Sequence, residues 1–161
     1  MNRIALLFPV AFITIACAPT DDSVDAGNAS VVRTVFSEIW SKGNVELIPS
    51  LFSENYVGHF PGGDTVHGRE GLAAEVMAHR RAFPDWAEGV EDEIIDHDRI
   101  AVRFSSRGTN TGEFLGSPPT GNRVEISEVA IFRFEDGKIA EQWVYPDMLS
   151  LQRQLDVRSR R

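Results

Sequence analysis

The stretch VAIFRFEDGKIAEQWVYPD, residues 129–147, contains the clearest structural pattern of the chain. Strand-favouring residues lie on both sides of an Asp-Gly turn, which is a strong indication of a β-hairpin. We therefore predict one strand over residues 124–134, a turn over 135–137 and another strand over 139–145. A proline then interrupts the hydrogen-bonding pattern, and Asp147 follows it immediately.

The rest of the chain places helices before and after this hairpin and further extended segments before it. Helical spacing of apolar residues predicts helices from Asn28 to Gly43, over 45–52, over 68–83 and over 148–155. Ile100, Val102 and Phe104 alternate with polar residues and predict a half-buried strand. Helices followed by antiparallel strands are typical of the α+β fold class.

Length and charge restrict the kind of protein. The 161 residues suffice for one domain, 42% of them are hydrophobic, and the net charge is -8 with a pI of about 5.0. This acidity argues against nucleic-acid binding, which needs a basic surface, and against electrostatic attachment to anionic membranes. It agrees with a small neutral or apolar ligand.

The N-terminus has the composition of an export signal. Residues 4–15 form an apolar run that is too short to span a bilayer but is suited to a signal peptide over residues 1–16. The stretch TIAC, residues 14–17, resembles the lipobox of bacterial lipoproteins, which implies lipidation of Cys17. We expect a protein of the bacterial cell envelope, at the outer membrane or periplasmic face, that meets the membrane only through this anchor. A soluble exported protein is the alternative.

Three segments follow the signal peptide. Residues 17–27 are small and acidic, which predicts a tether next to the lipid. Residues 28–156 form the predicted domain, and residues 157–161 form a basic tail. Cys17 is the sole cysteine of the chain, so no intramolecular disulfide can form.

Four stretches of the chain resemble one known family. They are AFPDW (82–86), DRIAVRFSSRGTNTGEFLGSPPTG (98–121), VAIFRFEDGKIAEQW (129–143) and PDMLSLQRQL (146–155). Over residues 30–156 the chain is similar to the SnoaL-like polyketide cyclases, members of the nuclear-transport-factor-2-like superfamily. The resemblance implies a cone-shaped, curved antiparallel sheet wrapped around the N-terminal helices, with an apolar cavity between them. One such fold hosts many activities, so the chemistry depends on individual residues.

Asp147 is the candidate catalytic residue. Trp143, Tyr145 and Asp147 share one parity of the last strand, which predicts that all three face the cavity. The resemblance implies an acid/base role, because the cyclases of the family carry their acid/base Asp just after the final strand. An apolar pocket raises the pKa of a carboxyl and makes it a stronger base. The alternative is that Asp147 caps the helix that follows.

Six residues are candidates for substrate binding: Trp143, Tyr145, Arg103, His59, Glu128 and Trp40. Arg103 and Glu128 are alternatively a buried ion pair, because Glu128 interrupts an apolar phase of its strand and needs a partner. For His59 the resemblance implies a place near the pocket, and a satisfied or exposed histidine is the alternative. His79 is interpreted as core packing or a partly exposed residue.

No metal or cofactor is predicted. The four histidines lack the spacing with carboxylates that a metal site needs, and a substrate can itself spread the charge of an enolate. Three hypotheses remain: cyclase- or isomerase-like proton transfer on a small hydrophobic molecule, a binding protein without turnover, and an interaction module. Val129 and Ile131 are apolar on the phase opposite Phe132 and Phe134, which favours a homodimer through the outer face of the sheet; a terminal segment that covers this face is the alternative.

Overall fold

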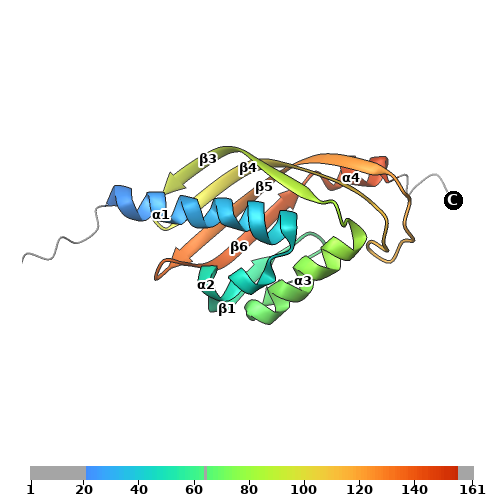
Figure 1. Ribbon diagram of the computed structural model, residues 1–161. Coiled ribbons are helices and arrows are strands. Elements are labelled where there is room, and N and C mark those ends of the chain that lie inside the picture. Colours follow the sequence, from blue (N-terminus) through green and yellow to red (C-terminus); the bar gives the residue numbers. More distant parts are fainter. Residues whose placement is uncertain (1–20, 64, 156–161) are drawn as a thin grey trace, which may run out of the picture.

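The computed structural model describes residues 21–63 and 65–155 of the chain (Figure 1). Its helices and strands, in chain order, are α1 (Asp21–Thr34), a π-helical continuation (Val35–Trp40), a 3-10 turn (Val45–Leu47), α2 (Ile48–Leu51), β1 (Phe52–His59), β2 (Thr65–His67), α3 (Gly68–Ala82), β3 (Ala87–Asp96), β4 (Arg99–Thr109), β5 (Arg123–Glu135), β6 (Lys138–Pro146) and α4 (Met148–Gln154). The predicted signal peptide, Cys17 and the basic tail lie outside the described residues, so the lipid anchor stays a prediction. Among the helices described, none is long and apolar enough to cross a membrane.

Helix α1 begins at Asp21, earlier than the predicted start at Asn28. Residues 21–27, predicted as tether, are therefore helical. Asp25 lies near the N-terminal end of this helix, where a carboxylate interacts favourably with the positive end of the helix dipole. The same acidity that suggested a solvated tether thus favours the start of a helix.

The strands form one six-stranded sheet in the order β2-β1-β6-β5-β4-β3. Strands β3 to β6 pair antiparallel in sequence, whereas β1 lies parallel to β6. Helices α1 and α3 lie on one side of this sheet (Figure 1). The predicted α+β fold, with a curved sheet around the N-terminal helices, is confirmed. The parallel β1–β6 pair departs from the predicted all-antiparallel sheet. β1 and β6 are far apart in the sequence, and a long connection between two strands allows them to pair in parallel.

The face of the sheet that the helices cover, here the inner face, carries the core. Along β4 and β5 every second residue is buried, as expected for strands with one wet face. The inner-face residues Val102 and Ala130 belong to the same cluster as the helical residue Phe36. The Phe36 ring lies 4.6 Å from that of Phe104 and 5.9 Å from that of Phe132, measured between centroids. These contacts fix the first helical segment over the middle of the sheet.

A bulge in β6 decides which of its side chains face the core. Arg133 of β5 pairs with Glu141, and the next residue, Phe134, pairs with Ile139, so Ala140 is the extra residue. Ile139 and Ala140 are both buried. An extra residue in one strand moves all the following side chains to the opposite face.

Beyond the bulge, Gln142 and Val144 face the core, and Trp143 and Tyr145 face outward. Buried Gln142 accepts a hydrogen bond from the Tyr56 hydroxyl at 3.1 Å, and Val144 packs against the main core. Tyr145 is 59% exposed. The predicted inward position of Trp143 and Tyr145 is therefore wrong, because strict alternation from the start of the strand does not account for the bulge.

Candidate functional site

Asp147 lies exposed at the start of α4, not in a cavity. Its Oδ1 accepts a hydrogen bond from the backbone N–H of Ser150 at 2.9 Å, and its carbonyl accepts one from the N–H of Leu151 at 3.0 Å. This is the geometry of a helix N-cap. The cap hypothesis is confirmed, and the predicted cavity position of the carboxylate is wrong, because Asp147 continues the outward phase of β6.

Trp143, Tyr145 and His59 also lie on the outer face of the sheet. His59 stacks on Trp143 with ring centroids 5.2 Å apart, and its Nε2 lies 2.9 Å from Glu141 Oε1. The guanidinium of Arg99 lies over the Trp143 ring, 5.6 Å from its centroid. The predicted place of Trp143, Tyr145 and His59 in an inner cavity is therefore wrong. His59 and Trp143 form an aromatic and charged cluster with Glu141 and Arg99 on the face away from the helices.

Arg103 lies on the outer face as well, where its guanidinium pairs with Glu91. It is exposed between the buried residues Val102 and Phe104. Glu128 faces inward on the neighbouring strand, directly opposite Phe104. The predicted Arg103–Glu128 pair is wrong, because strand parity places the two side chains on opposite faces of the sheet.

Glu128 and Trp40 are the predicted site residues that the structure places inside. Each is 8% exposed. The Trp40 ring meets the ring of His79 edge-on, with centroids 5.8 Å apart. Buried Ile126 and Ala130 flank Glu128 on the inner face of β5.

Four inner side chains carry buried polar atoms that have no hydrogen-bond partner within the described residues: His79 Nε2, Glu88 Oε2, Ser106 Oγ and Glu128 Oε1. We call these four residues the inner polar cluster. Ser106 pairs with Glu88 across β4 and β3. Trp86 links Glu88 to His79, since its Nε1 donates to Glu88 Oε1 at 3.1 Å and its ring centroid lies 4.5 Å from that of His79. Buried polar atoms in proteins are nearly always paired, so this cluster is the candidate site for a ligand.

Burial governs the charge of the inner polar cluster. It raises the pKa of Glu128 to about 7, a rise that the neighbouring Ser106 hydroxyl opposes. Burial also raises the pKa of Glu88 well above its usual range, and the charge of Glu128 adds to this rise. Burial lowers the pKa of His79 to about 4, so its ring is neutral at pH 7. At neutral pH the cluster is therefore partly protonated and contains no cation.

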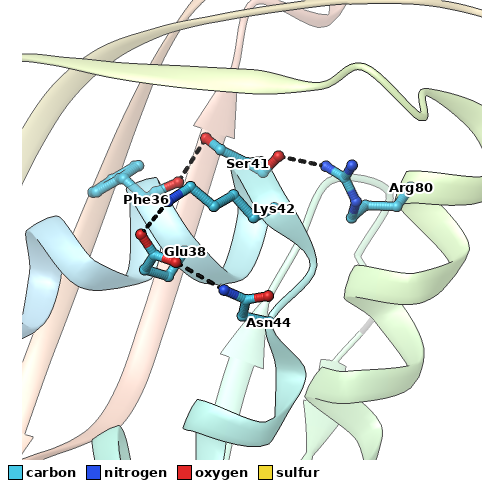
Figure 2. A network of polar contacts seen from close by, with 6 residues as sticks. All are labelled: Phe36, Glu38, Ser41, Lys42, Asn44 and Arg80. Carbon is cyan, nitrogen blue, oxygen red and sulfur yellow. Dashed lines mark hydrogen bonds and ion pairs between the residues drawn. The ribbon is translucent and has the colours of Figure 1, made fainter.

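The end of the first helical segment holds Glu88 in place. The π-helical stretch Val35–Trp40 leads into Ser41, whose Oγ donates to Phe36 O at 2.7 Å and accepts from the backbone N–H of Glu88 at 3.0 Å. Figure 2 shows this turn, with Arg80 of α3 donating to Ser41 O at 2.7 Å. The other contacts drawn there join Glu38 to Lys42 at 2.5 Å and to Asn44 at 2.7 Å. Short π-helical turns are frequent beside functional sites.

A surface hollow of about 510 Å³ lies elsewhere, against β1 and the β5–β6 turn. Its lining mixes cations such as Arg69 and Lys138 with acids such as Glu54 and Glu141, and it includes no residue of the inner polar cluster. We therefore do not assign the function to this hollow. In the part of the chain that the structure describes, no group of three or more His, Cys, Asp or Glu residues is arranged to hold a metal ion.

The family model of the SnoaL-like polyketide cyclases matches residues 30–155. The chain belongs to this family. The SnoaL-like chain is 26% identical over 121 residues to the aklanonic acid methyl ester cyclase DnrD of Streptomyces peucetius, a match that covers 73% of this chain and 83% of DnrD. It is 27% identical over 134 residues to the aklanonic acid methyl ester cyclase AcmA of Streptomyces galilaeus, covering 79% of this chain and 88% of AcmA.

Solved structures agree with the family assignment. Wild-type IdmH from Streptomyces antibioticus superposes with a TM-score of 0.70 at 29% identity, covering 81% of this chain and 99% of IdmH. A SnoaL-like protein from Jannaschia sp. CCS1 gives a TM-score of 0.78 at 24% identity, covering 83% of this chain and 94% of that protein. The latter similarity supports the fold alone.

Sequence reasoning missed most of the inner polar cluster of this SnoaL-like protein. The sequence does indicate that Ser106 is a buried polar residue, because it continues the buried alternation of Val102 and Phe104 along β4. Nothing in the sequence distinguishes Glu88, because it is one of several acidic residues in a stretch without alternation of apolar and polar residues. The aromatic packing of His79 agrees with its interpretation as a core residue, but an unpaired Nε2 cannot be deduced from sequence.

Proposed function

We propose that this SnoaL-like protein catalyses cyclase- or isomerase-type proton transfer on a small apolar molecule held between the inner face of the sheet and the helices. The observation that carries the proposal is the carboxyl of Glu128, which is buried near Glu88 and Ser106 and whose Oε1 has no hydrogen-bond partner within the described residues. That DnrD and AcmA are cyclases supports the reaction class.

Glu128 acts as the base in this proposal. With a pKa of about 7, it is available as a carboxylate to remove a proton from a carbon next to a carbonyl. The C–H bond breaks, an O–H bond forms on Glu128, and the electron pair moves toward the carbonyl oxygen. In a ring closure the resulting carbon nucleophile attacks a second carbonyl of the same molecule, and Glu128 returns its proton to the new alkoxide. Protons balance over the cycle.

Glu128→Gln is expected to lose this activity. The full chain is incubated in D₂O with 2-tetralone, an apolar ketone, and NMR follows the exchange of the hydrogens next to the carbonyl. An amide cannot accept the proton, so the protein-dependent rate falls by about 100-fold or more. Glu125→Gln, an exposed position on the same strand, is the matched control and keeps the wild-type rate. Equal exchange by wild type and Glu128→Gln contradicts the proposal.

A binding protein without turnover is the second candidate. The unpaired atoms of the inner polar cluster support ligand binding whether or not a reaction follows. Binding of 2-tetralone to the wild type without any acceleration of exchange selects this alternative over the enzyme.

The outer face of the sheet supports a homodimer as a further part of the proposal. One cross-strand row carries Ile94, Ala101, Ile131 and Trp143 on four adjacent strands. Ile94 is 67% exposed and Tyr145, on the same face, is 59% exposed. Such surfaces often pair with a symmetric copy. We expect sedimentation to show a dimer for the wild type and a monomer for Tyr145→Lys; a monomeric wild type contradicts the proposal.

A further inference from the structure

Glu88 is a second buried carboxyl beside Glu128. It lies on the edge strand β3, paired with Ser106 of β4, which is 1% exposed. Its Oε1 accepts the hydrogen bond from Trp86 Nε1 at 3.1 Å, whereas its Oε2 is buried and unpaired within the described residues. The backbone N–H of Glu88 is fixed by Ser41 Oγ at 3.0 Å. The carboxyl is thus oriented through one oxygen, and its other oxygen has no hydrogen-bond partner within the described residues.

Within the part of the chain that the structure describes, no cation pairs with either of these carboxyls. The ion pairs formed within residues 21–63 and 65–155 do not include Glu88 or Glu128. Arg80 reaches this region but donates to backbone carbonyls, namely those of Trp40 at 3.1 Å, Ser41 at 2.7 Å, Pro84 at 2.6 Å and Trp86 at 3.4 Å. His79, which lies beyond the Trp86 ring, is neutral at pH 7. The environment therefore favours uncharged carboxyls.

Two buried carboxyls without a cation do not both ionise near neutral pH, because each charge opposes the other in a medium of low dielectric constant. Burial and the charge of Glu128 both raise the pKa of Glu88, and burial raises the pKa of Glu128 as well. The pair therefore keeps a proton near neutral pH, and the buried Glu88 Oε2, which no donor of the described residues reaches, is the oxygen to which we assign it.

We propose that Glu88 is the second functional group of the site, a carboxylic acid that donates a hydrogen bond from Oε2 to the oxygen of a bound carbonyl compound or phenol. The inference rests on the proposed function, since Glu128 supplies the base. As Glu128 takes the proton from carbon, the electron pair moves to the carbonyl oxygen, where the Glu88 O–H stabilises the new negative charge. The Glu88 O–H bond is unbroken in this step, and the proton balance stays that of Glu128.

The proton on Glu88 is tested without any substrate. At about pH 8.5 exposed carboxyls are ionised, so the full chain is expected to show the infrared C=O band of a protonated carboxylic acid. The band disappears in Glu88→Gln and remains in Glu128→Gln. Its absence from the wild type, or its persistence in Glu88→Gln, overturns the inference. The result does not depend on turnover, so it separates failure of this inference from failure of the proposed function.

The donor role is tested with 2-naphthol, whose oxygen-bearing ring imitates an enolised ketone, using tryptophan fluorescence to follow binding. Glu88→Gln keeps an N–H donor and is expected to bind within about threefold of the wild type. Glu88→Leu removes the donor and is expected to bind about tenfold or more weakly. Equal binding by Glu88→Leu and wild type overturns the donor role, and so does a wild type that does not bind 2-naphthol.

Discussion

Glu128→Gln is expected to unfold at a higher temperature than the wild type at pH 8 and at nearly the same temperature at pH 4. Burial raises the pKa of Glu128 from 4.5 in the unfolded chain to about 7 in the folded protein. Below pH 4.5 both states are protonated and folding carries no penalty. As the pH rises to 7, the unfolded state ionises first, and the folded protein loses about 3 kcal/mol of its free energy of unfolding.

A glutamine at position 128 stays neutral and avoids that loss. The expected gain at pH 8 corresponds to roughly 10 °C in Tm for a domain of this size. His79 has the opposite sign, because its pKa is lowered to about 4 and its contribution is lost as the pH falls from 6.5. That loss affects both proteins equally, so the difference between them is the quantity to measure. The exposed control Glu125→Gln is expected to show no such pH-dependent gain, and a Glu128→Gln protein that melts at or below the wild type at pH 8 contradicts a buried, ionising carboxyl.

Gly112→Ala is expected to lower the free energy of unfolding by about 3 kcal/mol, measured by urea denaturation. A Cβ at this position lies 2.2 Å from Arg81 O and 3.0 Å from Ala82 Cα. The backbone N–H groups of Thr111 and Gly112 both donate to Ala82 O, at 3.0 and 3.1 Å. The added methyl group therefore forces the loop away from the end of α3 and breaks these hydrogen bonds. This loop carries Phe114, which packs on Phe83 with centroids 5.0 Å apart, so the cover over His79 is disturbed as well.

Gly89→Ala is the matched control for this substitution. A Cβ at Gly89 finds its nearest neighbour, Ser105 Oγ, at 3.7 Å, an ordinary contact. The expected change is within about 0.5 kcal/mol. Similar effects of the two substitutions mean that the loop is not docked on α3 as described.

The fold was predictable where the hydrophobic period is strong. The strands predicted over 124–134 and 139–145 appear as Arg123–Glu135 and Lys138–Pro146, and the helix predicted over 68–83 appears as Gly68–Ala82. The pattern changes from helical to strand-like after Trp86, and β3 accordingly runs from Ala87 to Asp96. The parallel partner of β1 depends on contacts between distant segments, which local patterns do not contain.

The site was less predictable, because a shift of one residue in the β5–β6 register decides which side chains of β6 face the core. Ala140 is an ordinary small apolar residue, and nothing in its sequence neighbourhood indicates a bulge. Its insertion turned Trp143 and Tyr145 outward. The inward position of Glu128 could be predicted, because β5 has no irregularity before Arg133 and Glu128 therefore shares the buried face of Ile126.

The parallel pairing of β1 with β6 has a consequence for the order in which the chain folds. Tyr56 and Gln142, hydrogen-bonded partners in the native protein, are 86 residues apart. During synthesis from the N-terminus, β1 therefore emerges long before its main partner exists, and only the short β2 can pair with it. The meander β3–β6 has nearest-neighbour contacts and a low loop-closure cost, so it is suited to form first. Closure of the N-terminal segment onto β6 is then the last topological step, and a nascent chain that ends before Lys138 cannot complete the sheet.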